Sequence, residues 1–165
     1  MTDENCRPVS VSRRIEAPAN KVFEILANPA RHPGIDGSGM LQDGAPNCAI
    51  SSIGEVFTMK MHNAEMGDYE MANYIVDFEL NHRIAWEPVL SAASRPEDAA
   101  DIGDRARHRW SYELTADGPS ATVVTETFDC SQAPDRLRKV LDNGNRWTES
   151  MTTTLEKLDR LCTNE

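Results

Sequence analysis

The sequence predicts an α+β fold in which one antiparallel sheet packs its apolar face against a long C-terminal helix. Between residues 55 and 129, apolar and polar residues alternate in several short segments, which is the period of half-buried strands. From about Pro134 to Cys162, apolar residues instead recur every three or four positions, as on one face of a helix. A sheet with one apolar face and a helix with one apolar stripe each need a partner, and packing one on the other satisfies both.

Length and composition restrict the class of protein. The 165 residues suit one domain over residues 1–165, with a loose N-terminus of about residues 1–7. A net charge of -10, from 17 Lys+Arg and 27 Asp+Glu, disfavours nucleic acid and anionic membranes as partners. No apolar run approaches the roughly 20 residues of a membrane span, and no signal peptide is recognisable, so we expect a cytoplasmic protein without membrane insertion. The cysteines lack a C-x-x-C spacing and are expected to be reduced thiols: Cys6, Cys48, Cys130 and Cys162.

The first third of the chain predicts a strand, a short helix and a long loop. The segment PVSVSRRIEA alternates as a strand with one buried face. In APANKVFEILANP, Pro18 suits the first position of a helix and Pro29 ends it. The following residues, up to Gly54, are rich in Gly, Pro and Asp, which predicts a loop with one helical turn near Arg31.

The middle of the chain predicts antiparallel strands. Tight turns at Asn81-His82 and at Asp117-Gly118-Pro119 join neighbouring strands, whereas the polar segment of residues 88–106 is expected to be a mobile loop. The inward-facing residues expected from the alternation are, in chain order, Phe57, Met59 and Met61; Tyr74, Val76 and Phe78; Ile84 and Trp86; His108, Trp110, Tyr112 and Leu114; and Val124, Glu126 and Phe128.

Gly144 lies on the apolar stripe of the predicted C-terminal helix. Glycine inside a helix is about 1 kcal/mol less favourable than alanine, so its presence on the inward face needs a reason. A missing side chain there would leave room for a ligand, and local bending of the helix is the competing explanation. On the first interpretation, Gly144→Leu should block a ligand and leave the fold intact.

Several segments resemble the SRPBCC or START-like superfamily, which includes polyketide cyclase/dehydrase-type proteins and relatives of the birch pollen allergen. They are VSVSRRIEAPANKVFEILANPARHPGIDGSG, RIAWEP, RHRWSYEL followed by TVVTETFD, and the C-terminal helix, so the resemblance spans about residues 8 to 162. It implies a helix-grip fold: a curved antiparallel sheet of about six strands wrapped around the last helix, two short helices after the first strand, and an elongated apolar cavity. The same fold carries different functions, so the resemblance fixes no reaction.

The inward rows contain the candidate ligand-binding residues. Alternation alone would favour ordinary core packing, but together with the resemblance it favours a pocket of a few hundred cubic ångströms. The residues expected to line it are Met40, Phe57, Met59, Met61, Phe78, Trp86, Trp110, Tyr112, Glu126, Gly144 and Trp147.

Glu126 is a carboxylate in an otherwise apolar row, between Val124 and Phe128. If it follows its neighbours inward, it must be protonated, solvated or paired, because a buried unpaired charge is expensive. The implied topology places the first and last strands side by side, so Arg13 is a candidate partner. A structural Arg13–Glu126 pair, a ligand-orienting or acid/base role, and a shifted register that exposes Glu126 are the alternatives. If the pair forms, Arg13→Met should destabilise the protein by roughly 3 to 5 kcal/mol.

Metal and cofactor sites are not expected. The four histidines share no ligand spacing: His32, His62, His82 and His108. The segment IDGSG lacks the lysine of a phosphate-binding loop and is expected to be a flexible loop at the cavity mouth.

The function expected from the resemblance is binding of a small hydrophobic or amphipathic molecule, by a carrier or sensor that is a monomer or homodimer. The first alternative is a polyketide cyclase or dehydratase, in which Glu126, Tyr112 or His108 moves protons. The second alternative is a protein-interaction module of the chaperone-activator type.

Overall fold

The computed structural model describes residues 7–43, 48–64, 67–91 and 107–164. The expected loose N-terminus, up to residue 6, and residues 92–106 of the expected mobile loop lie outside these ranges. The strands are β1 (Val9–Ile15), β2 (Leu41–Asp43), β3 (Val56–Asn63), β4 (Gly67–Glu79), β5 (Arg83–Leu90), β6 (Arg109–Ala116) and β7 (Thr122–Asp129). The helices are α1 (Ala19–Leu26), the 3-10 helix η1 (Pro29–Gly34), α2 (Asp135–Val140), the 3-10 helix η3 (Asp142–Trp147) and α3 (Thr148–Asn164).

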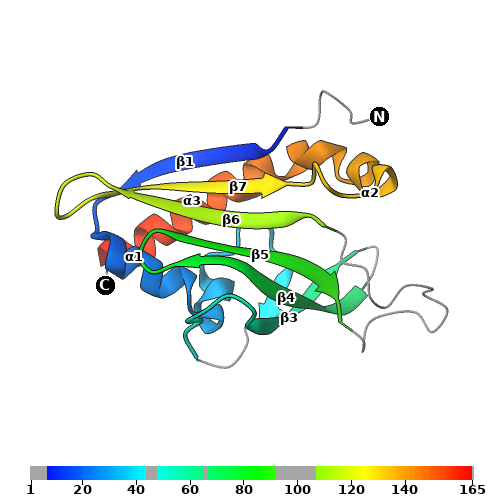
Figure 1. The fold of residues 1–165 in the computed structure, drawn as a ribbon, viewed down its shortest axis with the longest axis horizontal. Coiled ribbons are helices and arrows are strands. Elements are labelled where there is room, and N and C mark those ends of the chain that lie inside the picture. The colour runs from blue at the N-terminus through cyan, green and yellow to red at the C-terminus, as the bar shows by residue number, and fades with distance from the viewer. Residues whose placement is uncertain (1–6, 44–47, 65–66, 92–106, 165) are drawn as a thin grey trace.

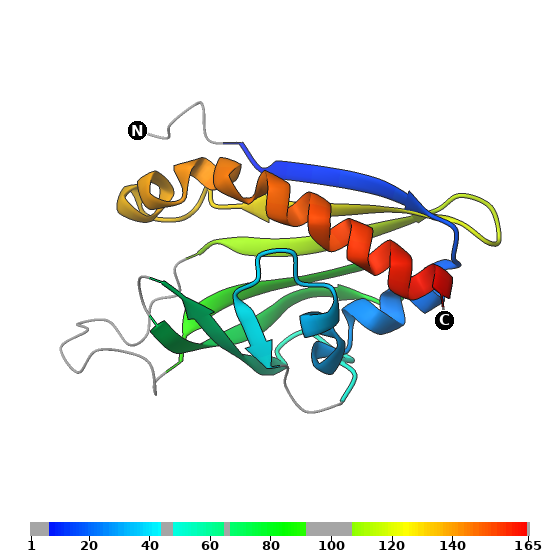
Figure 2. The same cartoon turned by 180° about the vertical axis from the view of Figure 1, so that it is seen from behind.

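The strands form one antiparallel sheet of seven strands in the order β1-β7-β6-β5-β4-β3-β2, drawn in Figure 1. The sheet curls, and α3 lies across its concave side in the view from behind (Figure 2). The helix-grip α+β fold is therefore confirmed, with two short helices after the first strand. The strand that was not expected is β2, which lies within the segment predicted to be a loop.

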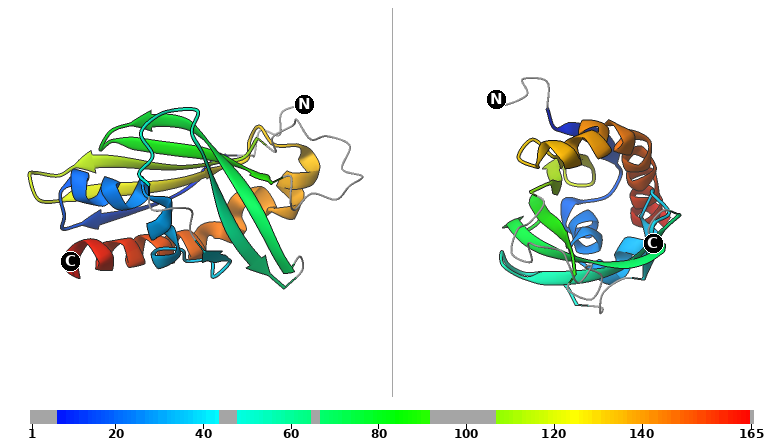
Figure 3. Two further views of the ribbon diagram at one scale, coloured as in Figure 1. Left: turned by 90° about the horizontal axis from the view of Figure 1, so that it is seen from below. Right: turned by 90° about the vertical axis from the view of Figure 1, so that its right-hand side faces the viewer.

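The first strand in the sequence, β1, pairs with the last strand in the sequence, β7, as the resemblance implies. In this register Val11 lies opposite Glu126 and Arg13 lies opposite Val124. Partners in an antiparallel pair face the same side of the sheet, so all four side chains belong to the concave face. The end-on view in Figure 3 shows the sheet curling around α1 and α3, which places this face in the interior.

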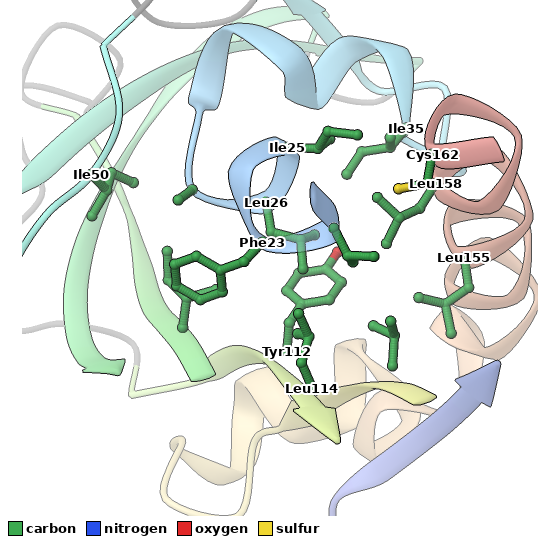
Figure 4. Packing of buried hydrophobic residues seen from close by; sticks show 14 of the residues in the cluster. Phe23, Ile25, Leu26, Ile35, Ile50, Tyr112, Leu114, Leu155, Leu158 and Cys162 are labelled. Atoms are coloured by element: carbon green, nitrogen blue, oxygen red, sulfur yellow. The ribbon is translucent and has the colours of Figure 1, made fainter. Parts of the chain in front are cut away.

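One end of the interior is filled by α1. Its residues Val22, Phe23, Ile25 and Leu26 are buried, because the apolar stripe of the helix faces the sheet. Figure 4 shows Phe23 and Leu26 of α1 near Tyr112 of β6, and Leu155 and Leu158 of α3 belong to the same cluster. This end is a packed core, so any cavity must lie toward the other end of the sheet.

The predicted inward row of β4 is wrong in its first half. Asn73 and Ile75 are buried, whereas Tyr74 and Val76 were expected to face inward. The pairing with β5 shifts between Ile75 and Asp77, which marks a β-bulge, and one extra residue exchanges the two faces of a strand. Phe78, beyond the bulge, packs edge-on against Phe23 at a ring distance of 5.5 Å.

The predicted helix from about Pro134 to Cys162 is interrupted. Asn143 and Gly144 have φ angles of 53° and 90°, which are left-handed and end the helical path between α2 and α3. Gly144 is also in close contact with β7, because an added Cβ would lie 2.6 Å from Cδ1 of Phe128. Of the two explanations for this glycine, the structure shows local bending, and it leaves no free space beside Gly144 for the leucine side chain of Gly144→Leu.

Candidate functional site

A cavity of about 250 Å³ lies between the concave face of the sheet, the segment after η1 and the first half of α3. Its volume agrees with the few hundred cubic ångströms expected. The residues that line it are His32, Ile35, Asp36, Ser38, Met40, Leu41, Met59, Met61, Tyr69, Met71, Asn73, Trp86, Pro88, His108, Trp110, Tyr112, Glu126, Trp147, Ser150, Met151 and Thr154.

Most of the sequence-predicted pocket residues line this cavity. They are Met40, Met59, Met61, Trp86, Trp110, Tyr112, Glu126 and Trp147, together with the catalytic candidate His108.

Phe57, Phe78 and Gly144 do not line the cavity. Phe57 packs against Trp86 and His32 at ring distances of 5.5 and 5.7 Å, and Phe78 packs against α1. Phe78 therefore belongs to the filled end of the interior, whereas Phe57 contacts two rings that line the cavity without lining it itself. Gly144 is covered by the Phe128 ring and so cannot offer room to a ligand.

Sequence reasoning missed the lining residues of β4 and of the segment after η1. In β4 they are Tyr69, Met71 and Asn73, which share a face that the bulge disguised. An alternation read from Tyr69 through Ile75 alone, without Phe78, would have revealed this face. The segment after η1 has no periodic pattern, so its contribution had no sequence signal apart from Met40.

The segment after η1 is anchored to α3. The Gly37 N–H donates to Thr154 Oγ1 at 2.9 Å, and Lys157 Nζ donates to the Asp36 carbonyl at 2.9 Å. A Cβ on Gly37 would lie 2.1 Å from the Ser150 carbonyl oxygen, so only glycine permits this approach of two backbones. The Asp36 carboxylate accepts from the N–H groups of Ser38 and Leu41, which shapes the turn. The segment that was expected to be a flexible loop at the cavity mouth does line the cavity, but these bonds anchor it to α3.

Glu126 points into the cavity, as its position in the strand predicted. It is only 3% exposed, and its Oε1 accepts a hydrogen bond of 3.0 Å from the Tyr112 hydroxyl. Burial raises the pKa of Glu126 from 4.5 to about 8, the Tyr112 hydrogen bond opposes this shift, and the negative charge of Asp36 adds to it. At neutral pH the carboxyl group is therefore mostly protonated, and it can donate as well as accept a hydrogen bond.

Tyr112 and the two histidines near the cavity are held in their neutral forms. Burial, followed by the charge of Glu126, raises the pKa of Tyr112 well above 10. Burial lowers the pKa of His108 to about 4. It also lowers the pKa of His32 to about 4, although the hydrogen bond from His32 Nε2 to the Leu26 carbonyl, 2.8 Å, opposes that shift. His32 stacks on Trp86 at 5.5 Å and acts as part of the wall.

The predicted pair between Arg13 and Glu126 does not form. Arg13 Nε donates to Asp159 of α3 at 2.7 Å, and the Arg13 side chain is 42% exposed. The predicted face of Arg13 is correct, because it lies opposite Val124, but its side chain pairs with Asp159 of α3, and Glu126 bonds with Tyr112 instead.

Arg13→Met should therefore destabilise the protein by less than about 1 kcal/mol, since partly exposed ion pairs contribute little. Urea unfolding at pH 7 would measure this, with Asp159→Asn as the matched change on the other partner. A loss of roughly 3 kcal/mol that Glu126→Gln partly restores would instead indicate a buried pair.

Polar atoms without a protein partner are concentrated in the cavity wall. Among the described residues, the buried side-chain atoms that find no hydrogen-bond partner include Glu126 Oε2, His108 Nδ1 and Trp147 Nε1. All three residues line the cavity. Buried polar groups are nearly always satisfied in proteins, so a cluster of exceptions around one cavity indicates that its contents supply the missing partners.

The described residues contain no group of three or more His, Cys, Asp or Glu side chains that could hold a metal ion. Of the cysteines in the same ranges, Cys48 is exposed, and Cys130 and Cys162 are buried. No helix in the described part of the chain is long and apolar enough to cross a membrane.

Comparison with known proteins gives distant relatives. No family model matches the chain. The uncharacterized protein Rv0088 of Mycobacterium tuberculosis is 32% identical over 124 residues, which are 74% of this chain and 48% of that protein. The chain spans about half the length of the curated relatives it matches.

Solved structures align over nearly the whole chain. Protein NE0264 from Nitrosomonas europaea has a TM-score of 0.67 and 16% identity, covering 98% of this chain and 97% of that one. A point mutant of norcoclaurine synthase from Thalictrum flavum, in complex with a transition state analogue, has a TM-score of 0.63 and 11% identity, covering 96% and 94%. These similarities agree with the sheet order and the position of the last helix. The chain therefore has the helix-grip fold that its resemblance to the SRPBCC or START-like superfamily implies.

Proposed function

We propose that the protein binds a small, largely apolar molecule in the cavity, as a carrier or sensor. The observation that carries this proposal is the cavity of about 250 Å³ itself, with apolar walls and buried polar atoms that no described residue satisfies. Ligand sites usually combine apolar and aromatic walls with a few well-placed polar groups. Ordinary core packing would leave neither the space nor the unsatisfied atoms.

The many methionines in the cavity wall support binding of ligands that differ in shape. Met40, Met59, Met61, Met71 and Met151 all line the cavity. Methionine is unbranched and polarizable, so it adapts to ligand shapes that rigid side chains would reject. The norcoclaurine synthase structure, solved with a transition state analogue, supports the idea that this fold accommodates small molecules.

Filling the cavity should abolish binding. Met71→Trp adds bulk at a lining position and should weaken binding of the fluorescent probe 2-naphthol by about tenfold or more, which is about 1.4 kcal/mol. Titration followed by naphthol fluorescence, with thermal unfolding to confirm the fold, would measure this.

The matched control for this experiment is Ile53→Trp, because Ile53 is 61% exposed. This variant introduces the same residue outside the cavity and should bind the probe like the parent. Equal affinity of Met71→Trp and the parent would contradict binding in this cavity.

A cyclase or dehydratase of the polyketide type is the second candidate, and the Tyr112–Glu126 hydrogen bond favours it. A carboxyl group whose pKa lies near 8 can both give and take a proton near neutral pH. Turnover of a poly-β-keto substrate mimic that is lost in Glu126→Gln would support the enzyme. Binding of the mimic without turnover would support the carrier. The chaperone-activator alternative would need an exposed docking face. The large apolar side chains exposed among the described residues are Ile53, Val56 and Leu80, and no observation groups them into such a face.

A further inference from the structure

The polar atoms of the cavity wall that lack a partner among the described residues lie in two groups. The inner group is the Tyr112 hydroxyl with the Glu126 carboxyl, whose Oε2 has no partner among the described residues. The outer group is His108 Nδ1 with Trp147 Nε1, which also lack partners there. All four residues line the same cavity, so one occupant can reach both groups.

The two groups lie on opposite sides of the aromatic pair formed by Trp110 and Phe128. Tyr112 is paired with Glu126, and the next inward pair along β6 and β7 is Trp110 with Phe128. His108 precedes β6 and lies 5.7 Å from the Phe128 ring. Tyr112 and His108 are thus separated by four residues, or roughly 13 Å of extended backbone, with Trp110 between them.

Trp147 places the outer group on the helix side of the cavity. Its ring lies 5.9 Å from Trp110 and 6.4 Å from Phe128, at the junction of η3 and α3. From there α3 runs toward the filled end, where Leu155 and Leu158 pack with α1 (Figures 3 and 4). The outer group therefore lies away from the filled end, and the inner group lies beside it.

The charges of the wall restrict the occupant further. Among the described residues, neither lysine nor arginine lines the cavity, whereas Asp36 and Glu126 do. An anionic head group would have no cationic partner and would face a carboxylate. His108 stays neutral, because burial lowers its pKa to about 4.

We infer that the ligand is an elongated neutral molecule with a flat apolar body and one hydrogen-bonding group at each end. Its inner end bonds with Glu126 and Tyr112, its body lies against Trp110, and its outer end accepts from Trp147 Nε1 beside His108. This inference rests on the proposed function and specifies the class of ligand for the same cavity. Fatty acids and other carboxylates are disfavoured by the same argument.

Four probes of one shape test the inference on the full chain: naphthalene, 2-naphthol, naphthalene-2,6-diol and 2-naphthoate. Calorimetric or competitive titration at pH 7 should give about three- to tenfold tighter binding for each hydroxyl group added, the value of one net hydrogen bond. The naphthoate anion should bind no more tightly than naphthalene.

Variants at each end identify the groups that respond. Trp147→Phe removes the outer N–H and keeps a ring. The double variant Tyr112→Phe with Glu126→Met removes both inner partners. It should destabilise the fold less than either single change, because no buried polar group is left without its partner. Either variant should lower the affinity for the diol to that of 2-naphthol. The affinity for 2-naphthol should change little, because the molecule can turn its hydroxyl group toward the remaining end, and naphthalene provides the apolar control.

The outcomes separate this inference from the proposed function. If naphthalene binds as tightly as the diol, water satisfies the polar atoms, and the inference is wrong while binding in the cavity stands. If 2-naphthoate binds most tightly, the neutral class is wrong. If no probe binds the parent protein, both the inference and the proposed function are overturned.

Discussion

Glu126→Gln should remove one contribution that lowers the stability of the parent protein as pH rises from about 5 to 8, so the stability of the variant relative to the parent should increase over this interval. In the folded protein the pKa of Glu126 is raised from 4.5 to about 8 by burial, so between these values the folded state holds a proton that the unfolded chain has released. The free energy of unfolding falls with pH wherever the folded state binds more protons. The difference between the two pKa values corresponds to a loss on the order of 4 kcal/mol over this interval.

Urea unfolding at intervals from pH 4.5 to 8.5 would measure this slope. Glu55→Gln is the matched control, because Glu55 is exposed and its pKa is lowered by hydrogen bonds from the Ser51 and Ser52 N–H groups. The pKa of Glu55 is lowered from its ordinary value of 4.5 in the folded protein, so above about pH 6 both states are ionised and this variant should keep the slope of the parent. A parent and a Glu126→Gln variant with the same slope would show that Glu126 ionises freely in the folded protein.

Gly144→Leu should destabilise the protein by roughly 3 kcal/mol. The φ angle of 90° disfavours any residue with a side chain, by about 1 to 2 kcal/mol. The new Cβ would also lie 2.6 Å from Phe128 Cδ1, and overpacking a core of this kind costs typically 1 to 3 kcal/mol.

Gly118→Leu separates these two causes. Gly118 has a similar φ angle of 80°, but nothing lies within 4 Å of an added Cβ. This control should lose only the conformational part, about 1 to 2 kcal/mol. Equal losses in the two variants, measured by thermal or urea unfolding, would show that the Phe128 contact contributes nothing.

The sequence predicted well those features that depend on local periodicity. The alternation around Glu126 placed its side chain on the inner face, because a strand has a period of two residues wherever it is regular. The same rule failed at β4, since the bulge between Ile75 and Asp77 has no marker such as glycine or proline. The alternation of inward and outward side chains can therefore be extrapolated along a strand only as far as the next β-bulge.

Two further features depend on tertiary contacts. The face of Arg13 followed from the alternation, but its partner depended on where Asp159 lies on α3. The break at Asn143 and Gly144 is stabilised by the approach of Phe128, which lies in another element. An Asn-Gly pair inside a predicted helix was the available signal for this break.

The contact of Gly37 with α3 couples two walls of the cavity, the segment after η1 and the helix, so that they should move together. Because the backbone of Gly37 lies directly against that of Ser150 and Thr154, no flexible side chain separates the two elements to absorb a displacement. Asp36 is the next residue, and its charge contributes to the raised pKa of Glu126. A sliding or rotation of α3 would carry Asp36 with it and change the electric field at Glu126, so the acidity of the cavity is coupled to the position of the helix.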